Sequence, residues 1–348
     1  MEQRRQVINK YVQLGLSTFR AFELAKMPRS TYYYKPKAGR KGRQPSTHTP
    51  LVNGDLITNE QVVELIETIC LDPFLDYGAD RMCMELNNRG FIINKKKVYR
   101  LMKEYNMLYP KRAKSAAQAR KRVDSNSPKP TFPFQVIELD IKYVYIHGLQ
   151  RNAYLLTVID TFTRMSLAWG LDLNMKAKQV AELLKEAIEN FAVENQGEYR
   201  FRIRTDNGPQ FIAKILSDAV KELSLEHEFI KPGTPQQNGH IESFHHIVSK
   251  LITERYEFEN LEAARKTFNQ FYITYNQRRI KKELLGKSPA QFYQLWLENK
   301  IGQTTRKNKH KFFFKEKPSR SIGSPSEDVL FALQNKENQN SKLYPELI

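Results

Sequence analysis

The first part of the chain carries apolar side chains at helical spacing. Over residues 1–34 this spacing is interrupted at Pro28, and Ser17 stands where a helix would begin. A helix-turn-helix and a small packing bundle explain the segment equally well. Residues 35–57 are rich in Lys, Arg, Gly and Pro and poor in apolar side chains, which predicts a basic linker.

A second helical unit is predicted over residues 58–110, as a helix-turn-helix-like DNA-binding domain. Helical periodicity is found in three segments of it, 62–70, 81–88 and 95–105. In the last segment the apolar positions follow the i, i+3, i+4, i+7 spacing of a buried stripe. This leaves four basic side chains on the outer face of that helix: Lys96, Lys97, Arg100 and Lys103.

Positive charge is concentrated around this last helix and the segment after it. Residues 95–122 contain eleven Lys or Arg and one acid. Lys111 and Arg112 belong to this set and begin a second predicted basic linker, 111–131. We expect the helix and the linker to contact the phosphate backbone or a groove of DNA. A solvated helix face joined to a flexible tether is the alternative.

From residue 132 to residue 256 the pattern changes to alternating strands and helices. Three β-like runs come first, at 136–145, 153–159 and 165–171, and helix, strand, helix and strand follow at 177–191, 201–205, 212–223 and 226–230. This order predicts a mixed α/β sheet covered by helices. Residues 257–298 continue as a helical extension, and 299–348 are predicted to be a basic and polar tail, partly disordered.

Three acidic residues stand at prominent places in this pattern. Asp140 lies in the first strand, Asp206 directly follows the fourth, and Glu242 falls in the first turn of a helix that starts near Gly239. Attack on a phosphodiester is assisted by two divalent metals roughly 3.5–4 Å apart, and Mg²⁺ takes carboxylate oxygens as ligands. The trio therefore predicts a two-metal site. An acid–base pair of the glycosidase type is compatible with the same spacing.

Charge is distributed unevenly along the chain. The 348 residues include 56 Lys and Arg and 38 Asp and Glu, a net charge of +18. Residues 132–247 hold 12 basic and 15 acidic residues, so the rest of the chain carries +21. Basic flanks around an acidic core favour a nucleic acid as partner, because Lys and Arg release counterions from phosphates.

Cysteine usage and apolar runs indicate the compartment. The two cysteines form no Cys-x-x-Cys motif, which favours neither a disulfide framework nor a zinc finger. No apolar run approaches the roughly 18 residues of a membrane-spanning helix. We therefore expect a soluble protein of a reducing compartment.

Two motifs resemble those of the DDE transposases and integrases. Residues 204–211 contain Asp-Asn-Gly-x-x-Phe, residues 235–242 contain Pro-Gln-x-x-Gly-x-x-Glu, and 35 residues separate Asp206 from Glu242. The chain looks more closely like the second-frame (OrfB-type) transposases of bacterial insertion sequences that move by copy-out and paste-in. That narrower resemblance rests on further matches: Tyr77-Gly78, Arg81, Leu86, 98–102, Tyr275-Asn276, Arg279, Leu285-Gly286 and Ser288-Pro289.

This resemblance implies a fold and a reaction. It implies a ribonuclease-H-like core over 132–256, between all-α helix-turn-helix units and C-terminal helices. It also implies that Asp140, Asp206 and Glu242 hold two Mg²⁺ or Mn²⁺ ions for nicking an element end and transferring its 3′-hydroxyl. In relatives a Lys or Arg seven residues after the Glu contacts DNA. That position is Ser249 here, which makes the neighbouring Lys250 the candidate.

The resemblance implies partners and a location as well. We expect a homo-oligomer, at least a dimer, on double-stranded DNA, acting alone or with an upstream-frame protein. We expect it in the bacterial cytoplasm, associated with the nucleoid. Two alternatives keep the fold: a transposase-derived DNA-binding protein that acts as a repressor or architectural factor, and a structure-specific nuclease.

Overall fold

The first unit of the chain, Met1–Ser46, is helical. The computed structural model describes residues 2–34, 45–109, 130–192, 201–231, 235–306 and 309–316. Within the first range lie three helices, α1 (Glu2–Gln13), α2 (Thr18–Leu24) and α3 (Arg29–Tyr33). Ser17 caps α2, since its side chain accepts a hydrogen bond from the backbone N–H of Arg20. Ile8, Ala21 and Met27 form the small core.

The second unit, Thr47–Ile348, begins with a small strand pair and three helices. β1 (His48–Pro50) pairs antiparallel with β2 (Leu56–Thr58), and α4 (Asn59–Cys70), α5 (Ala79–Asn88) and α6 (Lys95–Glu104) follow. A capping box of Thr58 and Gln61 begins α4, and Asn94 caps α6. These elements share one buried core.

The strand pair corrects one prediction. The linker predicted over 35–57 was wrong from residue 48 onward, because Thr49 is buried and Leu51 bridges to Phe91. Strands of three residues with few apolar side chains leave little periodicity to detect. Residues 35–44 and 110–129, which hold the rest of both predicted linkers, lie outside the described residues.

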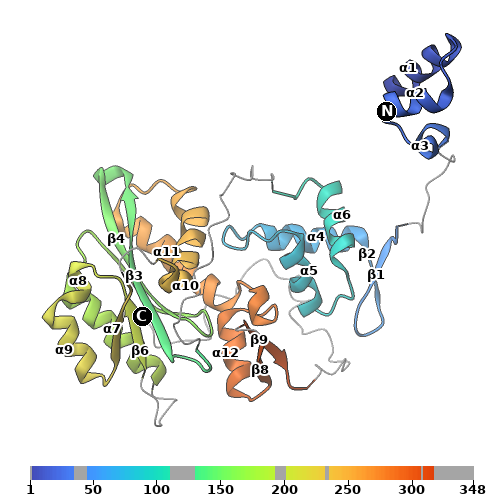
Figure 1. The fold of residues 1–348 in the computed structure, drawn as a ribbon. Coiled ribbons are helices and arrows are strands. Elements are labelled where there is room, and N and C mark those ends of the chain that lie inside the picture. Colours follow the sequence, from blue (N-terminus) through green and yellow to red (C-terminus); the bar gives the residue numbers. More distant parts are fainter. Residues whose placement is uncertain are drawn as a thin grey trace. The chain divides into compact units, whose positions relative to one another are not determined.

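A five-stranded mixed sheet is the centre of the second unit (Figure 1). Its strands are β3 (Val136–Ile146), β4 (Arg151–Asp160), β5 (Ser166–Asp172), β6 (Arg202–Thr205) and β7 (Glu226–Phe229). They lie in the order β5-β4-β3-β6-β7, with β3 antiparallel to β4 and parallel to β6. A meander of three strands extended by two parallel ones is the ribonuclease-H-like order, so the predicted fold class is confirmed.

Helices cover both faces of this sheet. On one face lie α7 (Ala177–Ala192), α8 (Pro209–Ile212) and α9 (Lys214–Glu222), and on the other α10 (Gly239–Val248) and α11 (Leu261–Gln277) (Figure 1). A 3-10 turn, η2 (Pro235–Asn238), precedes α10, and a π-helical turn, η3 (Ser249–Thr253), follows it. The helix predicted over 212–223 is divided, because Ala213 adopts an extended conformation.

The C-terminal described segment also corrects a prediction. After η4 (Lys282–Leu284) and α12 (Pro289–Leu297), β8 (Ile301–Arg306) pairs antiparallel with β9 (Lys309–Phe314). The prediction of a polar tail from residue 299 was therefore wrong up to residue 314. Ile301 is buried, and the ring of Phe312 lies 5.1 Å from that of Phe162 and 4.8 Å from that of Phe292. Packing against this distant core orders the hairpin. Residues 317–348 lie outside the described residues.

None of the described helices combines the length and the apolar composition that a membrane span requires.

Candidate active site

Asp140 and Asp206 lie at neighbouring positions on two parallel strands. In the pairing of β3 with β6, Ile137 is opposite Ile203 and Glu138 is opposite Arg204. Continuing this register by two residues places Asp140 opposite Asp206, the first residue after β6. Strand register therefore brings together two acids that are far apart in the sequence.

Asp140 belongs to the sheet face that α10 covers. Side chains alternate between the faces of a strand. Ile137 and Ile203 belong to the core on the α7 side. Glu138 and Arg204 point the other way and pair at 3.3 Å. Asp140, two residues further along β3, shares the face of Glu138 and contacts His245 of α10, whereas Asp206 lies beyond the end of β6.

Glu242 approaches the same place from α10. It lies in the first turn of that helix and is exposed. Partial burial raises the pKa of Glu242, the nearby charge of Asp140 raises it further, and His245 opposes both effects. One turn later, Nδ1 of the buried His245 lies 3.2 Å from Oδ2 of Asp140. The structure thus brings Glu242 into the electrostatic neighbourhood of Asp140.

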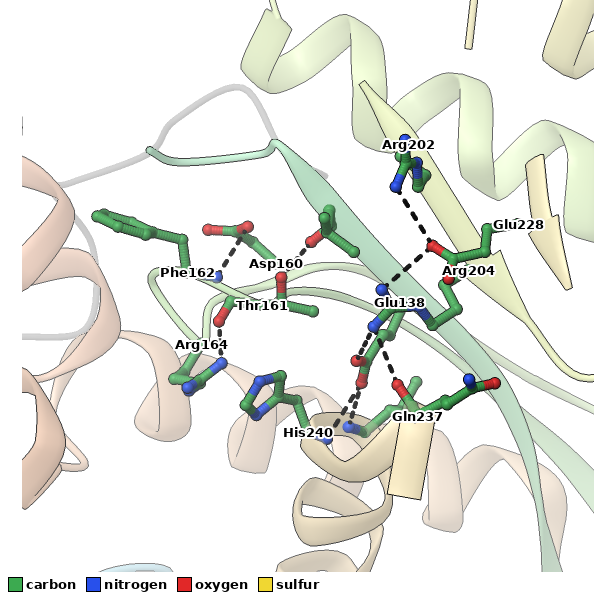
Figure 2. A network of polar contacts seen from close by, with 12 residues as sticks. Glu138, Asp160, Thr161, Phe162, Arg164, Arg202, Arg204, Glu228, Gln237 and His240 are labelled. Carbon is green, nitrogen blue, oxygen red and sulfur yellow. Dashed lines mark hydrogen bonds and ion pairs between the residues drawn. The ribbon is translucent and has the colours of Figure 1, made fainter. Parts of the chain in front are cut away.

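A buried carboxylate, Glu138, holds the start of α10 (Figure 2). Its side chain is fully buried, and its Oε2 accepts hydrogen bonds from the backbone N–H groups of His240 at 3.1 Å and Ile241 at 2.8 Å. Negative charge is favoured at a helix N-terminus. Burial nevertheless raises the pKa of Glu138 to about 7, against the opposing effects of Ile241 N–H and Arg204.

Arg204 extends this network across the sheet (Figure 2). Besides Glu138 it donates to the backbone carbonyl of Gln237 at 2.9 Å and to Glu228 at 3.1 Å. The side chain is 7 % exposed, so these contacts are made largely away from water. β3, β6, β7 and the turn before α10 are thereby joined. The strand and helix that carry Asp140 and Glu242 are held in one arrangement.

Sequence reasoning did not find Glu138 and Arg204 as site residues. A signal was present, because each stands two residues before a predicted catalytic acid, and Glu138 hence shares a strand face with Asp140.

Asp160, close by in Figure 2, organises a turn. It is fully buried and accepts hydrogen bonds from the backbone N–H groups of Phe134, Phe162 and Thr163, at 3.0, 3.2 and 2.8 Å. Burial raises its pKa, and these donors oppose the rise. It therefore stabilises the connection from β4 to β5.

The turn after β6 presents Asp206. The backbone N–H of Gly208 donates to Oδ1 of Asp206 at 2.8 Å, and the side chain of Asn207 donates to the carbonyl of Ile230 at 3.1 Å. A Cβ at position 208 would stand 3.0 Å from that same Asp206 oxygen. Glycine therefore allows the backbone to close tightly around the carboxylate.

The carboxylates of Asp140, Asp206 and Glu242 suit a hard divalent cation as ligands, but the structure does not bring the three side chains close enough together to bind one. All three side chains offer carboxylate oxygens, the ligands that Mg²⁺ and Mn²⁺ prefer. Within the described ranges, no group of three or more His, Cys, Asp and Glu side chains is placed to hold a metal ion. Asp140 is engaged by His245 and Asp206 by its own turn.

The predicted DNA-contacting residues fall into different environments. Lys96 and Lys103 are exposed on α6, and Arg100 is half-buried. Lys97 donates to the backbone carbonyl of His48 at 2.6 Å, and burial lowers its pKa. Lys250 pairs with the buried Asp76. Lys111 and Arg112 lie outside the described residues.

Comparison with known protein families gives three matches. The HTH-like domain family matches residues 58–115. Two families described as integrase core domains match residues 130–235 and 223–289.

Two of the curated relatives come from insertion elements. Over 295 residues the chain is 28% identical to an uncharacterized 39.2 kDa protein of insertion element IS476 from Xanthomonas euvesicatoria, which covers 84% of this chain and 77% of that protein. It is 26% identical over 251 residues to the transposase for insertion sequence element IS904 from Lactococcus lactis, covering 68% and 94%.

Among solved structures, the simian T-cell lymphotropic virus intasome in complex with PP2A regulatory subunit B56 gamma matches with 15% identity and a TM-score of 0.40, over 67% of this chain and 74% of that chain. The sequence matches confirm the resemblance: the chain matches an HTH-like domain followed by an integrase core domain, and its relatives include transposases and other proteins of insertion sequences.

Proposed function

We propose that this chain is a DDE transposase that nicks the end of an insertion sequence and joins the exposed 3′-hydroxyl to another phosphodiester. One observation supports the proposal: the register of β3 and β6 leads to Asp140 and Asp206 at the ends of two paired strands, and α10, which carries Glu242, contacts Asp140 through His245. Three carboxylates from three elements are the donor set that a polynucleotidyl transferase requires.

The proposed site residues have separate roles. Asp140, Asp206 and Glu242 would hold two Mg²⁺ or Mn²⁺ ions. Bound there, these ions supply the acidity that activates a hydroxyl nucleophile and the charge that stabilises the leaving oxygen. Glu138 positions α10 through the helix N–H groups, and His245 positions the carboxylate of Asp140.

The proposed reaction has two steps, and neither step forms a covalent bond between the protein and DNA. In the first, water adds to a phosphorus atom and the bond to the 3′-oxygen breaks, which leaves a 3′-hydroxyl and a 5′-phosphate. In the second, this 3′-hydroxyl adds to the phosphorus of another strand and loses its proton. The 3′-oxygen displaced from that strand leaves as a hydroxyl. No nucleophilic side chain is needed, because water and the 3′-hydroxyl are the nucleophiles.

DNA is proposed to bind along the HTH-like domain and the acidic site. Lys96 and Lys103 extend from α6 into solvent, where they can approach phosphates. Lys97 and Lys250 are engaged within the protein, by the carbonyl of His48 and by Asp76, so a phosphate would share each ammonium group with that partner. Assembly of two or more copies on paired DNA ends belongs to the same proposal.

The test is a cleavage assay on DNA that carries the end of the encoding insertion sequence. The wild type in Mg²⁺ is expected to nick and join this labelled duplex, whereas Asp206→Asn binds it without cutting. Asp218→Asn, an exposed aspartate on α9, is the matched control and should behave as wild type. Binding by wild type and Asp206→Asn alike, without metal-dependent cleavage by either, would refute the enzyme and favour a DNA-binding derivative of a transposase.

A further inference from the structure

Two segments join the HTH-like domain to the integrase core. The first is the loop of residues 71–78 between α4 and α5, and the second is the segment of residues 278–288 after α11. We call these two segments together the domain joint. They contain Tyr77-Gly78 and Arg279, which the sequence singles out but the proposed active site does not use.

A buried ion pair lies at the centre of the domain joint. Nη2 of Arg279 lies 2.7 Å from Oδ1 of Asp76, with the two side chains 4 % and 0 % exposed. Nη1 of Arg279 donates to the backbone carbonyl of Phe74. A guanidinium that binds a carboxylate and a carbonyl of one loop fixes both the distance and the orientation of that loop.

The hydroxyl of Tyr77 adds a second connection. It donates to the backbone carbonyl of Arg278 at 3.1 Å and accepts the backbone N–H of Ile280 at 2.8 Å. Tyr77 is fully buried, and burial raises its pKa to about 12, so the neutral hydroxyl keeps both roles at physiological pH. One side chain thus binds the backbone on both sides of Arg279.

The two domains also exchange apolar side chains across the domain joint. Ile280, which follows the core helix α11, is buried in the core of the HTH-like domain. Phe74, from the loop of the HTH-like domain, is buried in the core beneath α10 and α11, with its ring 5.6 Å from that of Phe271. Because each core is completed by the other domain, independent rotation of the two domains would expose both side chains.

The joint reaches the helix that carries Glu242. Lys250 of η3, directly after α10, pairs with the second oxygen of Asp76. Arg255 lies 3.9 Å from that oxygen and donates to the carbonyl of Pro73 at 3.2 Å. The loop of the HTH-like domain is therefore connected to the active-site helix and not only to α11.

We propose that the domain joint fixes the distance between the two domains and thereby selects the phosphodiester that is nicked. By holding the HTH-like domain rigidly on the integrase core, the positioning residues Asp76, Tyr77 and Arg279 set the distance between the DNA sequence that is bound and the phosphodiester that is nicked. This inference rests on the proposed transposase function. These residues are expected to determine the position at which the strand is nicked rather than the rate of nicking.

The first test maps the nick at single-nucleotide resolution. Wild type, Asp76→Asn and Tyr77→Phe are given a 5′-labelled duplex with the end of the encoding insertion sequence. Wild type should nick one phosphodiester, and the two variants should spread nicks over neighbouring ones while binding the duplex within about threefold of wild type. Nicking at the single wild-type position by both folded variants would overturn the inference that the domain joint selects the nick position. Nicking by none of the proteins would overturn the proposed function.

Tyr272→Phe provides the matched control. Its buried hydroxyl bonds Thr157 at 2.6 Å within the integrase core, so the same chemical change leaves the domain joint intact. This variant should retain the single nick position. Scattered nicks from Tyr272→Phe equal to those from Tyr77→Phe would overturn the assignment, because any loss of a buried hydroxyl would then have the same effect.

A second measurement tests the rigidity of the domain joint without catalysis. Spin labels at Glu104→Cys on α6 and Lys221→Cys on α9, in a chain that also carries Cys70→Ala and Cys83→Ala so that no native thiol is labelled, report the distance between the domains by double electron–electron resonance. A narrow distribution is expected for the otherwise wild-type chain and for Tyr272→Phe, and a broader one for Asp76→Asn and Tyr77→Phe. A distribution that is broad before any joint substitution, or unchanged after it, would overturn the inference even if no nicking were observed.

Discussion

Two arginine–carboxylate pairs, Glu138–Arg204 and Asp76–Arg279, are similarly buried, but the pKa values of their carboxylates are shifted in opposite directions. The first lies inside the integrase core and the second in the domain joint, and both carboxylates are 0 % exposed. For Glu138, burial outweighs the charges of Arg204 and Arg164 and two helix N–H groups and raises the pKa to about 7. For Asp76, burial also acts to raise the pKa, but Lys250 and Arg279 together lower it below its usual value.

The difference lies in the cations that hydrogen-bond each carboxylate. Only Arg204, which is shared with Glu228, donates to Glu138, and this does not offset the desolvation of that side chain, whereas Lys250 and Arg279 both donate to Asp76. The ion pair of Asp76 should therefore contribute more to the free energy of unfolding than the ion pair of Glu138. Glu138 should matter more for placing α10 than for the stability of the fold.

The largest effect is expected from Asp76→Asn. This change leaves Arg279 buried without its counter-ion, and breaking a buried pair from one side costs about 3–5 kcal/mol of unfolding free energy. Urea unfolding at pH 7 measures the loss, with the exposed Asp218→Asn as control. A loss below that of Glu138→Gln would contradict the ranking of the two pairs.

A smaller loss of stability is expected from Glu138→Gln. The amide oxygen can still accept a helix N–H, so the cost should be about 1–3 kcal/mol. Strand joining should fall by more than tenfold, because α10 carries Glu242 and is held by this side chain. Joining and DNA binding are measured on the same duplex. Wild-type joining by this variant would show that Glu138 does not position the site.

Removal of the Tyr77 hydroxyl should cost less again. Tyr77→Phe loses the hydrogen bonds to Arg278 and Ile280, worth about 0.5–1.5 kcal/mol each. Urea unfolding of Tyr77→Phe beside Tyr272→Phe compares a hydroxyl that spans two domains with one that does not. Equal stability of Tyr77→Phe and wild type would mean that these hydrogen bonds contribute nothing.

The smallest effect is expected from Arg278→Ala. Its guanidinium lies 2.8 Å from Asp72 at the edge of the domain joint, but the side chain is 53 % exposed. Exposed ion pairs contribute about 0–1 kcal/mol. A loss as large as that from Asp76→Asn would show that the edge of the joint, rather than its buried centre, attaches the domains.

These pairs show where prediction from sequence succeeds and where it ends. The strands and helices around Asp140 and Glu242 follow from local periodicity, and Asp206 stands in a short contiguous motif. Arg204 and Glu138, by contrast, are 66 residues apart, and Arg279 and Asp76 are 203 apart. No local pattern specifies partners at such separations.

The corrected segments have a similar physical reason. The hairpin of β8 and β9 is ordered by Phe162 and Phe292, which are distant in the sequence. Lys250 has the charge of a DNA contact, but in the structure it pairs with Asp76 of the HTH-like domain. Charge and periodicity describe a side chain, whereas its partner depends on the fold.

The central claim is that Asp140, Asp206 and Glu242, held by three separate elements, act as one catalytic site. Strand joining by Asp140→Asn, Asp206→Asn and Glu242→Gln in Mg²⁺ tests it most directly, with the exposed Glu257→Gln as control. Each of the three changes should slow joining by about a thousandfold, equivalent to about 4 kcal/mol of activation free energy, while DNA binding and the control stay at the wild-type level. Wild-type joining by any one of the three variants would contradict the claim.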